Sequence, residues 1–181
     1  MRSTLSVGLV VSVVALGVSA CLKAAEGTPA EGRARVGVYD SRAVAIAWAG
    51  TPSFNESMRS LHADHAKAKA AGDEKRVKEL EAEGAARQQR LHMQGFSTAP
   101  VDEILGHIKD SLPGIQKQAG VSALISKWDK GGLAKYPAAE QVDVTMALVD
   151  ALHPSDRQRQ CAIEAQKHEP IPLEKARDIK D

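Results

Sequence analysis

Residues 36–50 read VGVYDSRAVAIAWAG and decide the fold, because they join a first strand directly to a first helix. Their first residues alternate in the way that is typical of a short β-strand, which we predict over residues 35–39. The alanine-rich run over residues 41–49 predicts a helix, and a side-chain oxygen of Asp40 or Ser41 can cap its N-terminus. A strand this short needs another strand to pair with, so the position of its partner determines the fold.

The nearest candidate partner is the apolar run VSALISKW at residues 121–128, which comes much later in the chain. A turn at residues 129–132 separates it from a third candidate strand at residues 133–136. A sheet of two or three short strands is marginal in water. We therefore expect partner subunits, or the helix that carries Ile104 and Ile108, to cover this sheet.

Residues 54–94 predict two helices that fold back on each other as a protruding antiparallel hairpin. Ser53 and Glu56 form a capping box that predicts the start of the first helix. Gly72 suits the left-handed backbone conformation that follows the end of this helix, and Asp73 can cap the second helix. Apolar positions recur at heptad spacing in both helices, and a fold at Gly72 places them opposite one another. The opposed pairs are Ala68 with Val77, His65 with Leu80, Leu61 with Gly84, Met58 with Arg87, and Phe54 with Leu91. Each helix would be about 30 Å long.

The best amphipathic stripe follows Pro100, and its spacing predicts a further helix. Pro113 should kink this helix or split it in two, and Gly120 should end it. The stripe comprises Val101, Ile104, Leu105, Ile108, Leu112 and Ile115. Another helix is predicted over residues 146–152. We interpret residues 155–181 as a polar C-terminal tail that holds one exposed helix at about residues 156–167.

The N-terminus has the pattern of an export signal over residues 1–20. A positive Arg2 precedes an apolar run at residues 5–18, which is shorter than the roughly 20 residues that span a membrane. Small residues before Cys21 resemble a bacterial lipobox, which would be cut before Cys21 and lipidated on its thiol. The alternative is ordinary cleavage that leaves a free cysteine, and both interpretations export the protein. Residues 21–34 are rich in Ala, Gly and Glu, as flexible tethers are.

Composition excludes some classes of function. The chain has 181 residues and a formal net charge of +1, so its charge does not favour nucleic acid as a partner. If Cys21 carries lipid, Cys161 has no intrachain partner, because the chain has two cysteines. Aromatic residues make up only 3% of the chain. Trp48 and Trp128 could line a binding surface, although packing beside a strand is favoured for each.

Two short patterns are compatible with chemistry, but each has a simpler explanation. His62 and His65 flank Asp64 and could share a metal ion, yet no third ligand converges on them, so packed or solvated histidines are favoured. Ser41 has no histidine placed by the local sequence to activate it and no Gly-x-Ser-x-Gly turn around it, so helix capping is favoured. We therefore predict a protein that is not an enzyme, with no catalytic residue, metal site or cofactor.

The order of these elements and two stretches of sequence resemble the OmpH/Skp family of periplasmic chaperones. The first stretch is RVGVYDSRAVAIAWAG at residues 35–50, and the second is GVSALISKWDKGGLAKYPAAEQVDVTMALVDAL at residues 120–152. With the hairpin between them, the resemblance covers residues 35–154. It implies a homotrimer in which strands from three subunits form a small body and three helical arms enclose a cavity. That cavity would hold unfolded outer-membrane proteins without ATP.

The expected fold is α+β, with a small sheet of two to three short strands, a protruding helical hairpin and completion by trimerisation. The expected function is that of an ATP-independent periplasmic holdase for unfolded envelope or outer-membrane proteins. Its clients would bind the inner faces of the arms at Met58, Leu61, Leu80 and Leu91. The protein would be anchored to the outer membrane through lipid at Cys21, or otherwise be soluble in the periplasm. The alternative is a structural or single-partner envelope lipoprotein, which is favoured if the seam of the hairpin consumes those four side chains.

Overall fold

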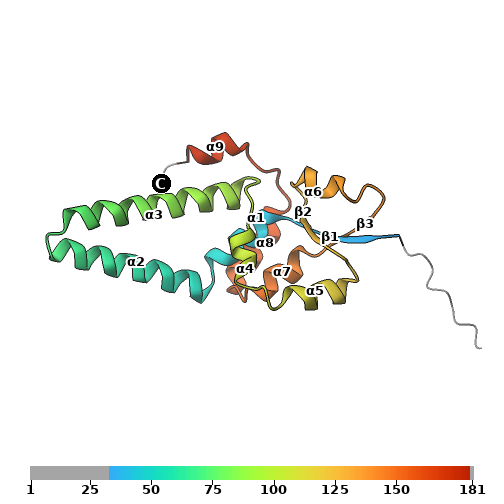
Figure 1. Ribbon diagram of the computed structural model, residues 1–181, viewed down its shortest axis with the longest axis horizontal. Coiled ribbons are helices and arrows are strands. Elements are labelled where there is room, and N and C mark those ends of the chain that lie inside the picture. The colour runs from blue at the N-terminus through green and yellow to red at the C-terminus, as the bar shows by residue number, and fades with distance from the viewer. Residues whose placement is uncertain (1–32, 180–181) are drawn as a thin grey trace, which may run out of the picture. The chain divides into compact units, whose positions relative to one another are not determined.

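The first strand lies at the centre of a three-stranded parallel sheet with the order β2-β1-β3 (Figure 1). The computed structural model describes residues 33–179. The predicted signal peptide over residues 1–20, the lipidation site Cys21 and most of the tether lie outside the described residues. The described elements are β1 (Arg35–Tyr39), α1 (Ser41–Ala49), α2 (Pro52–Ala70), α3 (Glu74–Phe96), α4 (Asp102–Gly106), α5 (Leu112–Ala119), β2 (Leu124–Ser126), α6 (Lys130–Ala134), β3 (Glu140–Asp143), α7 (Thr145–Ala151), α8 (Asp156–Ala165) and α9 (Leu173–Arg177). The fold is therefore α+β, mostly helical, with a small sheet.

The predicted pairing of the first strand with residues 121–128 is confirmed. β1 and β2 run parallel, with Gly37 opposite Leu124. Gly37 is needed here because a Cβ atom at this position would lie 2.9 Å from the Leu124 side chain and 3.1 Å from that of Val144. Both edges of β1 are occupied by strands of its own chain. β1 therefore does not depend on another subunit for its partners.

The prediction of a strand at residues 133–136 is wrong. These residues overlap α6, whose N-terminus is capped by Asp129 as its side chain accepts a hydrogen bond from the Gly132 N–H at 2.8 Å. The third strand is instead β3, which pairs with β1 so that Arg35 lies opposite Glu140. Three of the four residues of β3 are polar and exposed, so no apolar alternation marks it in the sequence.

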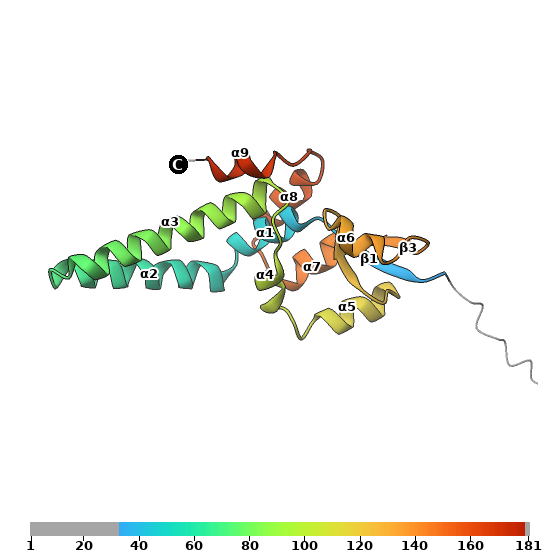
Figure 2. The same cartoon turned by 45° about the horizontal axis from the view of Figure 1, so that its top comes forward.

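The two long helices α2 and α3 are joined by a tight turn and lie side by side in both views (Figures 1 and 2). Gly72 lies in this turn with a φ of 70°, as predicted. Asp73 caps α3 by accepting a hydrogen bond from the Arg76 N–H at 2.9 Å, which confirms its predicted role. Leu61, Ala68 and Leu80 form a buried cluster between the helices, and Met58 and Val77 pack against it.

The predicted N-cap of α2 at Ser53 is wrong. The helix begins at Pro52, and the Thr51 hydroxyl is the cap, because it accepts a hydrogen bond from the Phe54 N–H at 3.1 Å. Proline suits the first helical position, since its missing N–H would have no partner there. Ser53 is left exposed in the first turn.

The main core lies around α1, whose Ala43, Val44 and Ala47 are fully buried. The amphipathic stripe after Pro100 supplies Val101, Ile104 and Ile108 to the same core. Its helix is split into α4 and α5, and Pro113 lies in the first turn of α5, as predicted. Gly120 ends α5 in the left-handed conformation with a φ of 65°. None of the helices in the described part of the chain is long and apolar enough to cross a membrane.

The segment predicted as a polar tail is packed against the rest of the described chain. Its first helix, α8, lies against α1, where Ala162 is fully buried. A Cβ atom at Gly50 would lie only 1.9 Å from the Gln158 side chain, so the glycine permits this close approach. The second helix, α9, lies along α3 with Ala176 fully buried (Figure 2). The predicted exposed helix is thus present, but one face of it belongs to the core.

Candidate functional site

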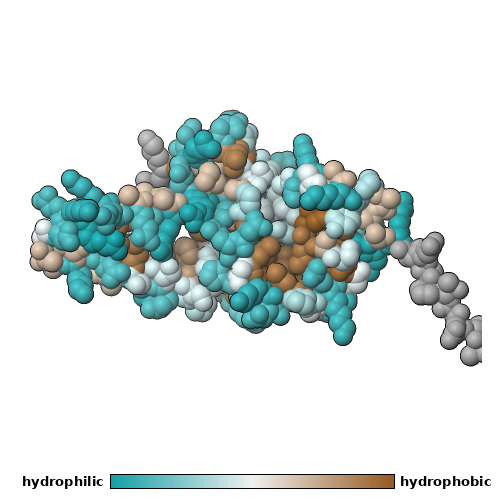
Figure 3. All heavy atoms as spheres, in the orientation of Figure 1, coloured by the Kyte–Doolittle hydropathy of each residue, from teal (hydrophilic) through white to brown (hydrophobic). Residues whose placement is uncertain are grey.

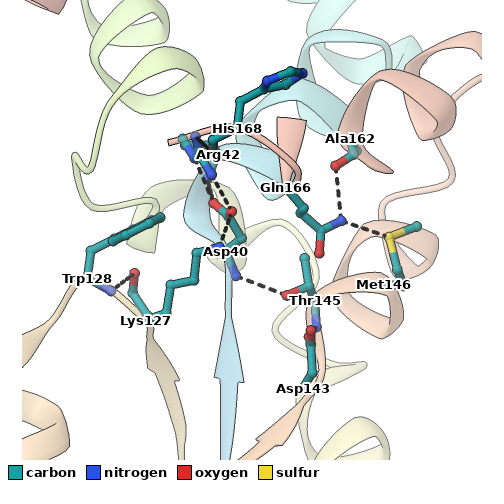
Figure 4. A network of polar contacts seen from close by, with 11 residues as sticks. Asp40, Arg42, Lys127, Trp128, Asp143, Thr145, Met146, Ala162, Gln166 and His168 are labelled. Carbon is teal, nitrogen blue, oxygen red and sulfur yellow. Dashed lines mark hydrogen bonds and ion pairs between the residues drawn. The ribbon is translucent and has the colours of Figure 1, made fainter. Parts of the chain in front are cut away.

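The carboxyl ends of the three parallel strands bring polar side chains together at one edge of the sheet (Figure 4). Asp40 follows β1, Lys127 follows β2 and Thr145 begins the helix after β3. This edge is where open parallel sheets place their functional groups. The Asp40 N–H donates a hydrogen bond to the Thr145 hydroxyl at 3.0 Å, which ties the first strand to the third.

The Asp40 carboxylate is the centre of a buried charge cluster. Its Oδ1 accepts hydrogen bonds from the Arg42 backbone N–H at 3.0 Å, which confirms the predicted helix cap, and from Arg42 Nε at 3.1 Å. Its Oδ2 accepts from Arg42 Nη2 at 2.8 Å and lies 2.5 Å from Lys127 Nζ. Asp40 is only 1% exposed and Arg42 only 3%. Because two cations face one carboxylate, the cluster carries a net positive charge.

Two opposing effects act on the pKa of Asp40. Burial by itself would raise the pKa of this carboxyl, but hydrogen bonds and charges from Arg42 and Lys127 outweigh that effect and hold the pKa below its usual value. The Trp128 ring lies beside both cations, with Arg42 Cζ at 5.2 Å and Lys127 Nζ at 4.6 Å from its centroid. Such contacts stabilise cations that are partly removed from water.

Arg42 links the charge cluster to an apolar groove of about 840 Å³, which we call the Phe96 groove. Arg42 lines the groove and donates a hydrogen bond from Nη1 to the His168 carbonyl at 2.8 Å. The groove lies among α1, the end of α3, α8 and the segment after α8. Its apolar lining comprises Ile46, Phe96, Cys161, Ala165, Ile171 and Ile179, and charged or polar residues complete it.

Two of the three exposed large apolar side chains of the described residues line this groove. The three are Phe96 at 49%, Leu173 at 38% and Ile171 at 36% exposure. Phe96 and Ile171 line the groove, and Leu173 follows two residues after Ile171. Figure 3 shows a brown apolar area beside α9 within a mostly hydrophilic surface, and a larger one where α4, α5 and α7 lie. Exposed apolar patches of this kind mark interaction sites on soluble proteins.

The residues predicted to bind clients lie elsewhere. Leu61 and Leu80 are buried between α2 and α3, and Met58 packs against them. Leu91 is half-buried and, with Met58 and Leu61, lines a separate cavity of about 330 Å³ formed by α2 and α3. None of the four lines the Phe96 groove. The contact between α2 and α3 therefore uses three of the four side chains that were expected to hold clients.

Sequence reasoning missed Phe96 and Ile171 as candidate site residues. Phe96 lies just beyond the predicted end of its helix, where an aromatic side chain has no seam to pack into. Ile171 lies between two prolines in a polar segment. An isolated large apolar residue in such a segment is the signal that could have identified it.

Several of the other aromatic and histidine side chains have local partners. Trp48 stacks on His107 with 4.1 Å between ring centroids, and it meets Phe54 edge-on. His65 Nε2 lies 3.3 Å from a carboxylate oxygen of Glu81. Within residues 33–179, no group of three or more His, Cys, Asp or Glu is arranged to hold a metal ion.

Comparison of the chain with protein-family models, with curated proteins and with solved structures finds no match in any of the three. The function of the Phe96 groove must therefore be inferred from its own geometry and surface.

Proposed function

We propose that this protein is a non-catalytic, ATP-independent holdase of the periplasm that binds apolar segments of unfolded envelope or outer-membrane proteins in the Phe96 groove. The carrying observation is that two of the three exposed large apolar side chains of the described residues, Phe96 and Ile171, line this groove. Unfolded chains expose apolar surface, and burial of that surface contributes about 25 cal/mol per Å². Several weak contacts of this kind hold a client without selecting one sequence.

The proposed relationship to the OmpH/Skp family assigns α2 and α3 to a protruding antiparallel arm. The closed cluster of Leu61, Ala68 and Leu80 supports an arm whose seam holds its two helices together. The base of this arm, where α3 ends at Phe96, is then the place at which clients bind.

Phe96→Ser is expected to reduce, severalfold, the ability of the protein to prevent aggregation of a urea-unfolded outer-membrane protein. The substitution removes an exposed aromatic side chain from the groove without emptying the core. Light scattering after dilution of the unfolded protein measures the effect. Met58→Ser is the matched control, because Met58 lies in the arm outside the groove. Equal loss of protection in both variants would contradict the assignment of the groove and favour the arm.

The second candidate function is that of a structural envelope protein with a single defined partner. The burial of Leu61 and Leu80 favours it, since this burial removes apolar surface from α2 and α3 that unrelated clients could have used. The same scattering experiment separates the two functions. A wild-type protein that fails to protect several unrelated unfolded proteins would leave the single-partner function in place.

We also propose that the protein is a homotrimer. The apolar row of α5 supports this assembly, because Leu112 and Ile115 are only half-buried and no residue of α5 is buried. A second copy that packs on this row would remove it from water. Sedimentation equilibrium is expected to give three times the mass of one chain, and a monomeric mass would refute the trimer.

We propose that the protein is exported, lipidated at Cys21 and anchored to the outer membrane through this lipid. Support comes from the apolar run that precedes the small residues before Cys21. Cells that express the protein are expected to incorporate labelled palmitate into it, and Cys21→Ser is expected to abolish the label. A wild-type protein without label would refute the lipid anchor.

A further inference from the structure

The wall of the Phe96 groove includes an extended segment of the protein's own chain. This segment, residues 168–172, lies between α8 and α9 and reads HEPIP; we call it the strap. It contributes His168, Glu169 and Ile171 to the lining of the groove. The groove is therefore already in contact with a segment of the chain that presents one large apolar side chain, Ile171, to it.

Two backbone groups of Ile171 fix the strap to the end of α3. The Ile171 N–H donates a hydrogen bond to the Phe96 carbonyl at 3.0 Å. The buried Ser97 hydroxyl donates a hydrogen bond to the Ile171 carbonyl at 2.7 Å. The Phe96 carbonyl ends a helix and lacks an intrahelical donor, so it needs a partner from outside the helix. A bound peptide could satisfy both groups in the same way.

The sequence of the strap favours this single point of attachment. Pro170 and Pro172 have no backbone N–H and keep the chain extended, so Ile171 supplies the one N–H within this tripeptide. The attachment is incomplete, since Ile171 and Leu173 remain more than one third exposed. A partner segment that buries more apolar surface at the same place would bind more favourably than the strap.

The strap is held at both ends by contacts outside the apolar lining of the groove. Before Ile171, the His168 carbonyl accepts a hydrogen bond from Arg42 of the buried charge cluster. After Ile171, α9 buries Ala176 against α3, and Gln89 donates a hydrogen bond to the Arg177 carbonyl at 3.3 Å. Release of α9 would free the strap while the lining supplied by α1, α3 and α8 stays in place.

We propose that the strap is an internal ligand of the Phe96 groove, and that an extended apolar segment of a partner protein binds by displacing it. This inference rests on the proposed function of the groove. The incoming segment takes over the hydrogen bonds to the Phe96 carbonyl and the Ser97 hydroxyl. The apparent affinity for partners is then the intrinsic affinity multiplied by the fraction of molecules in which the strap is open.

The test uses the full mature chain and a fluorescein-labelled peptide that copies residues 168–178. Ala176→Asp places a carboxylate under α9 and is expected to release the strap. If the strap is closed in nine of ten molecules, its release tightens peptide binding about tenfold. Lys175→Gln is the matched control, because it makes the same change in charge on the exposed face of α9 and should bind as the wild type does. Fluorescence anisotropy measures the dissociation constants.

A second variant and a second readout keep the outcomes distinct. Gln89→Ala removes one contact to α9 outside the groove and should tighten binding about twofold, so it decides the question if Ala176→Asp fails to fold. Unchanged or weaker peptide binding in both variants would overturn the role of the strap, and the proposed holdase function would stand. That function fails separately if Phe96→Ser protects an unfolded client as well as the wild type does.

Discussion

Replacement of Asp40 by asparagine is expected to lower the free energy of unfolding by about 3–5 kcal/mol at neutral pH. Asparagine keeps the shape of the side chain and caps helices as well as aspartate does, so the change isolates the charge. Arg42 is 3% exposed, and its guanidinium would lose its carboxylate partner without gaining water. Since small domains are stable by only about 5–15 kcal/mol, this loss is a large part of the total.

The matched control is Asp73→Asn. Asp73 also caps a helix, but it is exposed and takes part in no ion pair described for residues 33–179. Asparagine preserves its cap, so the free energy of unfolding should change by less than about 0.5 kcal/mol. Urea denaturation followed by circular dichroism measures both variants. Equal effects at the two positions would mean that the buried ion pair contributes no net stability beyond the cap.

The dependence of this effect on pH has a defined sign. The pKa of the Asp40 carboxyl is lower in the folded protein than in the unfolded chain. The stability that the ionised group contributes is therefore fully present above about pH 4, near the unfolded pKa, and is lost as the pH falls through the lower folded pKa. The difference between the wild type and Asp40→Asn should be constant near neutral pH and should shrink in acid. A difference that grows in acid would contradict the depressed pKa.

Ala162→Asp is expected to separate α8 from α1 and to destabilise the protein by at least about 3 kcal/mol. Ala162 is fully buried, and an unpaired carboxylate at that position must either lose its hydration or displace the helix. Because α8 also lines the Phe96 groove, binding of partner segments should be lost at the same time. Thermal unfolding and the anisotropy of the labelled peptide measure the two effects.

Cys161→Asp is the control for the predicted loss of stability. It introduces the same charge at the neighbouring residue of the same helix, where the side chain is exposed. Its melting temperature should stay within a few degrees of the wild-type value, as expected for a surface change. Equal destabilisation by both substitutions would show that charge on α8 matters and that its packing on α1 does not.

Local sequence signals were sufficient for most of the helical boundaries. Asp40 and Asp73 act as predicted caps, Gly72 and Gly120 adopt the left-handed conformation, and Pro113 lies in the first turn of the second of two helices. These features depend on the conformational preferences of single residues and of their nearest neighbours. The prediction of a cap at Ser53 was wrong for a reason of the same kind. Thr51 and Pro52 also favour a helix start, and they lie earlier in the chain, so the helix begins there.

The third strand and the packing of the C-terminal helices depended on contacts that local patterns do not encode. β3 carries one apolar residue, Val142, and forms because β1 offers it a free edge. α8 is strongly polar, yet its Ala162 is buried because Gly50 lets the two helices approach closely. Small residues such as these have little hydrophobic signal, although their positions decide which surfaces can meet.

The sequence by itself determined the first strand and the helical nature of residues 52–96, because each depends on periodicity and turn residues within one segment. It also identified the later apolar run that contains the partner strand β2. Only the tertiary structure decided that Leu61 and Leu80 are enclosed and that Phe96 and Ile171 are exposed around one groove. An apolar side chain has the same tendency to leave water wherever it lies. The geometry of its neighbours then decides whether the chain itself can cover it or leaves it for a partner.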